Sequence, residues 1–185
     1  MLYLVRHGQA DTPPNTCIGQ TNIPLTEKGI QQILHDTLPT LRELKLQHPL
    51  LLSSPLLRTM QSATIISEEL TIPLKKHAAF QEINMGAWDG LSFSEIQQRW
   101  PDQYEARGKN FSTFRPPYGE SFSDLQQRVV GAFHPFFNEA RPIIIVTHAG
   151  VIRTLLCTVH KNPLQNLFDY SPSNGSITAI DKKLL

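Results

Sequence analysis

The stretch that decides the fold is the N-terminal one, Met1-Leu-Tyr-Leu-Val-Arg-His-Gly-Gln-Ala10. Its apolar run from Leu2 to Val5 is bounded, rich in strand-forming residues and too short for a helix, so it predicts a buried β-strand. The triplet Arg6-His7-Gly8 follows at once, at the strand end where open α/β sheets place their ligand crevices. Gly8 would let the backbone come close to a bound molecule. Taken alone, the triplet fits a polar strand end at the surface as well as a site, so the rest of the chain has to decide.

Length and composition indicate an ordinary globular protein. A chain of 185 residues fits a single domain, which we expect to span residues 1–185. The net charge of +1 argues against a broad interface for nucleic acid or for an anionic membrane, because both need a strong basic field. The apolar run from Leu2 to Val5 before Arg6 is too short for a signal peptide, and no apolar run approaches a membrane span. We therefore expect a cytoplasmic protein with no nucleic-acid or membrane partner.

The cysteines and histidines show no metal-binding pattern. Cys17 and Cys157 are the only cysteines and do not form a CxxC motif, so neither a disulfide framework nor a zinc site is expected. Five histidines lack HxH and HExxH spacing, and we interpret them as structural or surface residues. These are His35, His48, His77, His134 and His160. We expect no metal and no cofactor.

The rest of the chain alternates predicted helices and strands. Thr26 can cap a helix that begins at Glu27 and that Pro39 should kink or split, and Ser54 before Pro55 predicts a helix starting at Pro55. Further predicted elements are strands over 50–52, 74–80 and 143–147, a short helix from Ser92 or Ser94 to Trp100, a helix opened by a capping box of Ser121 and Asp124, a helix through 151–156, and one or two edge strands within 167–180. This alternation predicts an α/β fold: a three-layer αβα sandwich with a mainly parallel sheet.

Two segments are expected to lie outside helices and strands. Residues 11–24, rich in Pro, Asn, Thr and Gly, predict a loop that leaves the first strand from the end that carries His7. Residues 101–118 are poorly periodic and mix aromatic with basic side chains. We interpret them as a lid or cap over one end of the sheet.

Three predicted strand ends carry chemically active side chains. Arg6 and His7 follow the first strand, Arg58 lies just beyond the second, and His148 follows the strand over 143–147. Parallel strands end on one side of the sheet, so these residues can converge on one pocket. Singly, Arg58 fits a solvated helix arginine and His148 a hydrogen-bonded core residue. Two arginines and two histidines together, with a helix N-terminus, describe a site for a small dianion such as phosphate.

Five motifs span almost the whole chain in a fixed order: Leu4-Val-Arg-His-Gly8, Ser53-Ser-Pro-Leu-Leu-Arg58, Glu82 ahead of Gly86-Ala-Trp-Asp-Gly90, Gly119-Glu-Ser121, and Val146-Thr-His-Ala-Gly150. In this order they resemble the histidine phosphatase superfamily, in its phosphoglycerate-mutase-like branch. The resemblance implies that His7 is a nucleophile that becomes phosphorylated. It also implies that Arg6, Arg58 and His148 bind the phosphoryl oxygens, and Ala149 beside His148 is expected to contact substrate.

The resemblance further implies that Glu82 donates a proton to the leaving group. From the residues alone, Glu82 would be an ordinary loop carboxylate, so this role depends on the family pattern. A donor has to be protonated, which partial burial near Trp88 could arrange. The other roles have independent physical support. Fixed cations can neutralise a transferring phosphoryl group without a metal, and arginines beside His7 disfavour its charged imidazolium form.

The residues just after the first motif depart from the family pattern. The family commonly has Glu and then Thr after Arg-His-Gly, with an Asn three residues further on. This chain has Gln9, Ala10 and Pro13, with Asn15 two places late. Because the Thr hydroxyl is lost, we expect Asn15 or Gln20 to supply the missing substrate contact. A turn that depends on Gly19 explains the loop around Gln20 equally well.

The sequence favours a hydrolase. Cofactor-dependent mutases of the family are longer and carry an Arg- and Tyr-rich insertion that is not found here. The loop over 13–25 and the aromatic stretch before Gly119 resemble α-ribazole phosphatases of cobalamin synthesis. A broad-specificity sugar or nucleotide phosphatase and a phosphoglycerate mutase stay as alternatives. A non-catalytic binder of phosphorylated ligands is a third, supported only by Ala10. The expected partner is a small phosphorylated substrate, and the sequence leaves a homodimer open.

Overall fold

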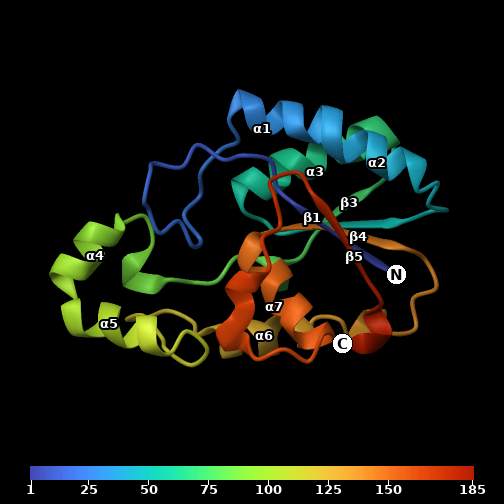
Figure 1. Cartoon of the computed structure of the whole chain (residues 1–185). Helices are drawn as coiled ribbons and strands as arrows, with labels where there is room; N and C mark the ends of the chain where they lie inside the picture. The colour runs from blue at the N-terminus through green and yellow to red at the C-terminus, as the bar shows by residue number, and fades with distance from the viewer.

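The computed structural model describes residues 1–185 and is built on one five-stranded sheet with the strand order β3-β2-β4-β1-β5 (Figure 1). Strands β1 to β4 are parallel, and β5 pairs antiparallel with β1 at one edge. Strand β4 lies at the centre of the sheet, and the mainly parallel arrangement is as predicted. The strands are β1 (Leu2–Arg6), β2 (Leu50–Ser53), β3 (Leu74–Lys76), β4 (Ile143–Thr147) and β5 (Ile177–Ile180).

Helices cover both faces of the sheet, which confirms the predicted α/β sandwich (Figure 1). Side chains alternate along a strand, so Leu4 and Ile145 enter one hydrophobic core while Val5 and Ile144 enter the other. The first core lies against α6 (Phe122–Gly131) and α7 (Ala149–Val159). The second lies against α2 (Leu38–Glu43), α3 (Leu57–Leu70) and the turn Ile33–Thr37, which follows α1 (Glu27–Gln32).

Most of the predicted helix starts are confirmed. Thr26 caps α1 by accepting a hydrogen bond from the Gly29 N–H, and the Pro39 region splits the helix through a π-helical turn at Ile33–Thr37. Capping boxes begin α4 at Ser92 and α6 at Ser121. In each case a side-chain oxygen satisfies a backbone donor that the helix cannot satisfy itself.

Two predicted boundaries are wrong, while the tail holds one of the one or two edge strands expected there. Helix α3 begins at Leu57 rather than Pro55, because Leu56 has an extended backbone with φ −67° and ψ 143°. The Ser54 hydroxyl accepts from the Leu56 N–H at 3.4 Å and contacts the His148 ring at 2.8 Å. The strand over 74–80 ends at Lys76, where its pairing with β2 stops. The tail contributes one edge strand, β5, while Leu164–Asp169 forms a 3-10 helix.

The segment 101–118 is more regular than its sequence suggests. It contains the helix α5 (Pro101–Lys109), which lies with α4 (Phe93–Arg99) at one side of the molecule, away from the sheet (Figure 1). Its ends follow the usual preferences, with Pro101 in the first turn and basic residues in the last. No residue of α5 is fully buried, so the helix has no apolar stripe for sequence periodicity to reveal.

Two further expectations concern membrane-spanning segments and disulfides. No helix has the length and apolar character needed to cross a membrane. Cys17 and Cys157 are both free and buried, in line with the expected absence of a disulfide framework.

Candidate active site

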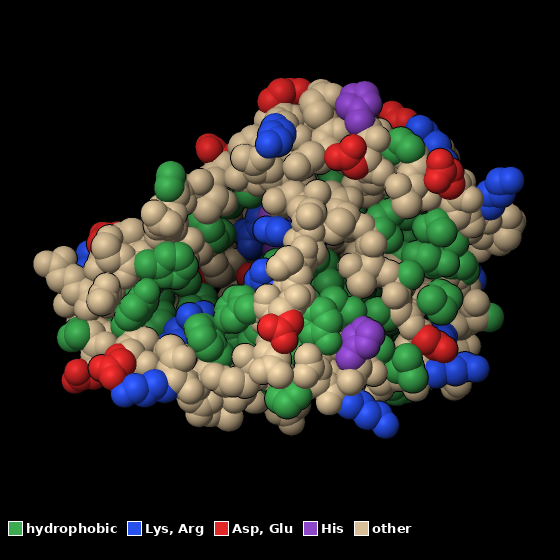
Figure 2. Space-filling model, viewed as in Figure 1, with side chains coloured by type: hydrophobic (Ala, Val, Ile, Leu, Met, Phe, Trp, Pro, Cys, Tyr) green, Lys and Arg blue, Asp and Glu red, His purple; other side chains and the backbone are tan.

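A cavity of about 310 Å³ opens at the carboxyl ends of the parallel strands. Figure 2 shows this face of the molecule hollowed, with basic side chains inside the hollow and hydrophobic side chains on its rim. The lining brings together five of the residues that the sequence singles out: Arg6, His7, Arg58, Glu82 and Ala149. His148 is fully buried just behind them, with its ring centroid 5.2 Å from that of His7.

His7 is held as a neutral imidazole with one free nitrogen. Its backbone N–H continues the sheet by donating to the Thr147 carbonyl, and its Nδ1 lies 2.7 Å from the Gly8 carbonyl oxygen. A carbonyl only accepts, so Nδ1 carries the proton and Nε2 keeps its lone pair. Burial, and then the nearby Arg58, lower the pKa of His7 from 6.5 to about 3. The expected neutral form is thus supported, with burial as the larger cause.

Two guanidinium groups beside His7 are fixed by backbone carbonyls. Arg58 donates to the carbonyl oxygens of Gly19 and Thr21, each at 2.8 Å, and is almost fully buried. Arg6 donates from Nη1 to the Pro172 carbonyl at 2.8 Å, while its buried Nε has no hydrogen-bond partner within the protein. Burial lowers the pKa of both, but an arginine keeps its charge at any ordinary pH. The site therefore offers two oriented cations to an anion.

His148 ends β4 and starts α7, and it also has a free nitrogen. Its Nε2 lies 2.8 Å from the Ser54 hydroxyl, whereas its buried Nδ1 has no hydrogen-bond partner within the protein. Burial and the charge of Arg58 hold its pKa well below the ordinary value, so the ring is neutral. If the Ser54 hydroxyl donates to Nε2, the proton stays on Nδ1, which can then donate to an anion.

Glu82 approaches the start of α7 very closely. Its carboxylate accepts hydrogen bonds from the backbone N–H groups of Ile83 at 2.9 Å and Gly150 at 3.1 Å. A Cβ atom on Gly150 would lie 2.2 Å from Glu82 Oε1, so a larger residue here would displace the carboxylate. The expected partial burial of Glu82 is confirmed, although its carboxylate meets backbone donors rather than an aromatic ring. Trp88 is buried among aromatic rings, while Glu82 is half-buried and meets backbone donors.

The other two expected substrate contacts lie outside the cavity lining. Asn15 is exposed in a left-handed conformation with φ 54°, and its carbonyl accepts a hydrogen bond from Phe93. Gln20 points away from the cavity, and its Nε2 donates to the backbone carbonyl of Glu82 at 2.9 Å. The structure therefore places Gln20 against the expected proton donor and Asn15 at the surface.

Gly8 has a packing role that the sequence analysis did not anticipate. A Cβ atom at this position would lie 2.2 Å from the carbonyl oxygen of Gly29 in α1. The Gly8 N–H donates to the Ser62 hydroxyl of α3 at 3.1 Å. The glycine thus lets α1 pack closely against the loop after β1 and keeps His7 in place.

Two arginines that the sequence analysis did not single out also line the cavity. Arg153 donates from Nε to the Tyr170 carbonyl, and its guanidinium carbon lies 5.1 Å from the centre of the Phe168 ring. Arg107 of α5 lies over Phe111 at 4.6 Å. Neither forms an ion pair with a carboxylate. Helical spacing could have found Arg153, one turn after Ala149, but the aperiodic sequence of α5 holds no such signal for Arg107.

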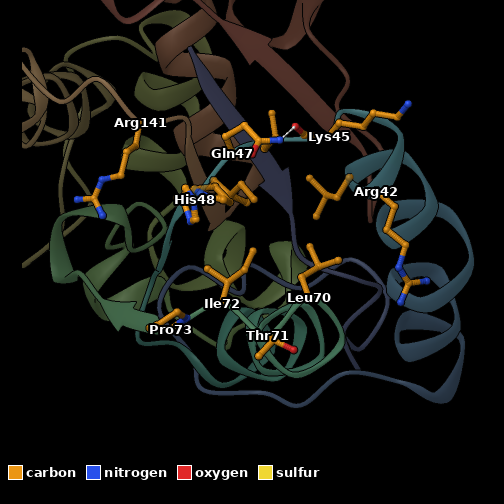
Figure 3. Close-up of a pocket in the computed structure, with 13 residues that line it drawn as sticks. Arg42, Lys45, Gln47, His48, Leu70, Thr71, Ile72, Pro73 and Arg141 are labelled. Carbon is orange, nitrogen blue, oxygen red and sulfur yellow. Dashed lines mark hydrogen bonds between the residues drawn. The ribbon is translucent and has the colours of Figure 1, made fainter.

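A second, larger cavity of about 510 Å³ lies elsewhere, near the carboxyl ends of α2 and α3 (Figure 3). Its lining includes Arg42 and Arg141, but both form ion pairs at 2.8 Å, with Glu69 and Glu139. It contains no paired nucleophile and acid. No three His, Cys, Asp or Glu side chains are grouped in the protein so as to hold a metal ion.

The sheet, the two histidines and the convergent arginines are those of a phosphoryl-transfer protein. The family model described as "Histidine phosphatase superfamily (branch 1)" matches residues 2–183, and the chain belongs to this family.

Known proteins that resemble the chain have different descriptions. It is 30% identical, over 84% of its length, to a 6-phosphofructo-2-kinase/fructose-2,6-bisphosphatase of Gallus gallus, and spans only 32% of that protein. It is 29% identical, over 84% of its length, to a 2,3-bisphosphoglycerate-dependent phosphoglycerate mutase of Bartonella henselae, of which 79% is covered. The solved structure of an α-ribazole phosphatase from Shigella flexneri superimposes with a TM-score of 0.84 at 26% identity, covering 97% of this chain and 89% of that one.

Proposed function

We propose that this chain hydrolyses phosphomonoesters without a metal ion, through a phosphohistidine formed on His7. The observation that carries the proposal is the neutral His7 ring, whose Nε2 is free beside two fixed guanidinium groups. The unpartnered nitrogens Arg6 Nε and His148 Nδ1 add buried polar atoms that a phosphoryl group would satisfy. Membership of the family supports the same conclusion.

In the first step, the lone pair of His7 Nε2 attacks phosphorus. A P–N bond forms while the ester P–O bond breaks, and its electron pair goes to the leaving oxygen. Arg6, Arg58 and His148 neutralise the charge on the three non-bridging oxygens. Glu82, entering this step protonated, gives its proton to the leaving oxygen, which departs as an alcohol.

In the second step, water attacks the phosphohistidine. Glu82, now a carboxylate, takes a proton from the water as its oxygen bonds to phosphorus. The P–N bond breaks, its electron pair returns to Nε2, and inorganic phosphate leaves. The neutral ring of His7 is thereby restored. Dividing hydrolysis into two such steps replaces one difficult reaction by two easier ones.

A rapid-quench experiment tests the intermediate. Incubation with a ³²P-labelled phosphomonoester should trap label on the protein, in a bond that is stable to base and labile to acid. His7→Ala should carry none, while Arg42→Met, altered at an exposed ion pair far from the cavity, should be labelled like the wild type. Equal labelling of the His7→Ala protein would rule out the proposed nucleophile.

For the substrate, we propose α-ribazole 5′-phosphate as the first candidate. The likeness to the Shigella flexneri structure supports it. So does the cavity wall, where Phe93, Phe122 and Phe168 can pack against a flat, uncharged base. A broad-specificity sugar or nucleotide phosphatase would use the same phosphate site with a less selective wall.

Arg107 and Arg153 favour a second candidate: a phosphomonoester whose leaving group carries another anion, such as a carboxylate or a second phosphate. Both guanidinium groups stack on phenylalanine rings, which leaves in-plane N–H donors for an anion. The names of the Gallus gallus and Bartonella henselae relatives include substrates of this kind.

A substrate panel separates these candidates. It should contain α-ribazole 5′-phosphate, fructose 2,6-bisphosphate, 3-phosphoglycerate, a nucleotide and a neutral sugar phosphate. The highest kcat/KM on α-ribazole 5′-phosphate would support the first candidate, and the highest on the di-anionic compounds the second. Conversion of 3-phosphoglycerate to its isomer, rather than to inorganic phosphate, would favour a mutase. Phosphate binding with no turnover on the whole panel would indicate a non-catalytic binder.

A further inference from the structure

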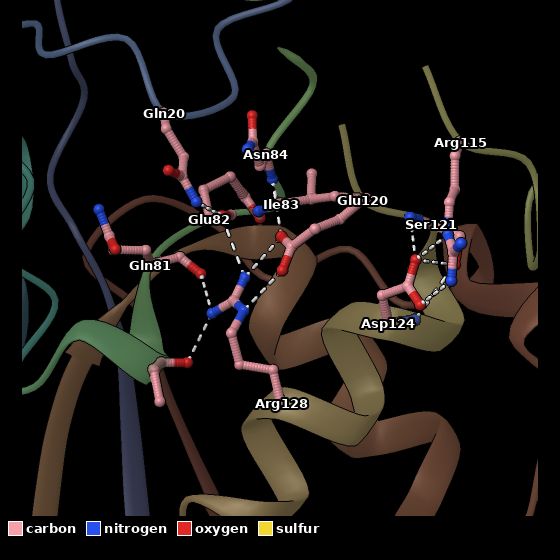
Figure 4. Close-up of polar contacts among 11 residues, drawn as sticks. Gln20, Gln81, Glu82, Ile83, Asn84, Arg115, Glu120, Ser121, Asp124 and Arg128 are labelled. Carbon is pink, nitrogen blue, oxygen red and sulfur yellow. Dashed lines mark hydrogen bonds and ion pairs between the residues drawn. The ribbon is translucent and has the colours of Figure 1, made fainter. Parts of the chain in front are cut away.

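The main chain around Glu82 is held from two sides by side chains of distant segments (Figure 4). From α6, Arg128 donates to the carbonyl oxygens of Ala79 at 2.7 Å, Gln81 at 3.2 Å and Glu82 at 3.4 Å. From the loop after β1, Gln20 Nε2 donates to the same Glu82 carbonyl at 2.9 Å. One backbone oxygen next to the expected proton donor therefore receives two side-chain donors.

Arg128 is itself fixed by Glu120 of the Gly119-Glu-Ser121 motif. The pair is bidentate, with Nε and Nη2 of Arg128 each 2.8 Å from a Glu120 oxygen, and both side chains are about three-quarters buried. Glu120 also accepts from the Asn84 N–H at 2.9 Å, and its own N–H donates to the Asn84 carbonyl at 2.7 Å. A planar guanidinium whose nitrogens are all used in this way has one orientation only.

Gln20 connects the same point to the phosphate site. Its neighbours Gly19 and Thr21 are the residues whose carbonyls hold Arg58. Its own N–H donates to Asp89 at 3.3 Å. Asp89 ends the segment 81–89 that carries Glu82, which we call the acid loop. A continuous set of hydrogen bonds thus runs from Arg58, which faces the phosphoryl group, through the loop 19–21 to Glu82.

These hydrogen bonds fix the main chain at Glu82, as strands and helices fix the main chain at the other site residues. His7, Arg58 and His148 lie at the ends of strands or in a helix, whereas residues 81–85 belong to neither a helix nor a strand. A proton donor has to lie within about 0.5 Å of its productive position, which an unsupported loop does not ensure. The side chain of Glu82 has only two backbone donors of its own, from Ile83 and Gly150.

We propose that Arg128, Glu120 and Gln20 form an acid brace that positions Glu82 for proton transfer to the leaving group. The inference rests on the proposed function and deepens it. The three side chains act through the Glu82 main chain and do not line the cavity, so they are positioning residues.

Leaving groups of different basicity distinguish a positioned acid from general structural support. An alkyl alkoxide needs a proton in order to leave, whereas 2,4-dinitrophenolate leaves without one. Damage to the position of Glu82 therefore slows formation of the phosphoenzyme selectively for alkyl phosphates. The quantity that measures this step is kcat/KM, because it does not include the later attack of water, in which Glu82 serves every ester alike. Damage to the fold or to phosphate binding slows both kinds of ester together.

The test compares Arg128→Met and Gln20→Ala with a matched control, Arg115→Met. Arg115 forms an exposed bidentate pair with Asp124 at the start of the same helix and makes no hydrogen bond to the acid loop (Figure 4). We expect kcat/KM for an alkyl phosphate to fall about 10- to 100-fold in Arg128→Met and about 5- to 20-fold in Gln20→Ala, since a general acid supplies 10²–10⁴-fold in rate. With 2,4-dinitrophenyl phosphate the loss of kcat/KM should stay below about 3-fold.

Two further measurements sharpen the result. Arg128→Lys, which keeps donors but loses the bidentate pair, should recover part of the alkyl phosphate rate. In a Glu82→Gln background, Gln20→Ala should cost almost nothing more, because its effect passes through the acid.

Equal losses on both esters, or no loss on either in Gln20→Ala, would overturn the brace. Gln20→Ala decides alone if Arg128→Met does not fold. Failure of the proposed function has a different signature. It shows in the wild-type protein as a missing phosphoenzyme and no ester hydrolysis, whereas failure of the brace shows only in the variants.

Discussion

The floor and the wall of the active-site cavity are built in different ways. The floor consists of Arg6, His7, Arg58 and His148, and the wall carries Arg107 and Arg153. On the floor, His7 and His148 follow directly on β1 and β4, whose last residues, Arg6 and Thr147, pair in the parallel ladder. Backbone register therefore brings the two histidines together. On the wall, Arg107 and Arg153 are held by stacking on phenylalanine rings. A ladder of backbone hydrogen bonds tolerates little change, while a stacked side chain can be exchanged at little cost to the fold. The comparison indicates that the reaction is set by the sheet and the choice of substrate by the segments around it.

Removing the nucleophile from the floor should have the largest effect. We expect His7→Ala to lower kcat by at least about 10⁴-fold, as loss of a covalent nucleophile does in other enzymes. Steady-state hydrolysis of a phosphomonoester measures this, with circular dichroism to confirm that the variant is folded. A variant that retains a tenth of the activity would mean that the floor does not carry the chemistry.

Removing a cation from the floor should come next. Arg58→Met deletes a donor to the transferring phosphoryl group and also frees the carbonyls of Gly19 and Thr21. We expect a loss of about 10²- to 10³-fold in kcat, the range for one donor to developing charge. Inhibition by inorganic phosphate should weaken in parallel. Arg42→Met, at a surface ion pair, serves as the control and should behave like the wild type.

Changes to the wall should be smaller and should depend on the substrate. Arg153→Met and Arg107→Met should each lower kcat/KM for a doubly anionic substrate by about 10-fold, the value of one charge-assisted hydrogen bond. Hydrolysis of a neutral alkyl phosphate should change less than about 2-fold. Equal losses on the two substrates would place these arginines with the floor and remove the distinction between floor and wall.

The smallest expected effect is the response of the floor to pH. Because the pKa of His7 is lowered to about 3, its ring should stay neutral and protonated on Nδ1 from pH 8 down to pH 5. Nitrogen chemical shifts of the ring measure this directly. A transition near pH 6.5 would show that burial does not lower the pKa of His7.

The same shift has a consequence for stability. Between pH 6.5 and about 3, the unfolded chain binds a proton at His7 that the folded protein does not. The contribution of neutral His7 to the free energy of unfolding should therefore be fully present above pH 6.5. It should be lost progressively as the pH drops toward 3. Denaturant titrations of the wild type and of His7→Asn should show a shallower fall in the variant.

The floor could be predicted from the sequence because each residue follows a short apolar run. Arg6, His7 and His148 keep their place next to their strands whatever the loops do, and Arg58 falls within the first turn of a helix that begins two residues later than expected. Glu82 could be named only through the family pattern, because its loop has no periodicity. The direction of the Gln20 side chain could not be predicted from its place in the sequence. We expected it to contact substrate, whereas its amide donates to the Glu82 carbonyl, 62 residues away in the chain.

The sequence alone therefore determined the alternation of helices and parallel strands, the residues at the strand ends, and the family. These depend on local periodicity and on motifs that lie within a few residues of one another. Only the tertiary structure decided that Gly8 serves the packing of α1, that Arg107 and Arg153 enter the cavity, and that Arg128 holds the acid loop. Each of these contacts joins segments more than 20 residues apart or depends on the direction of a side chain, and neither is recorded in local sequence pattern.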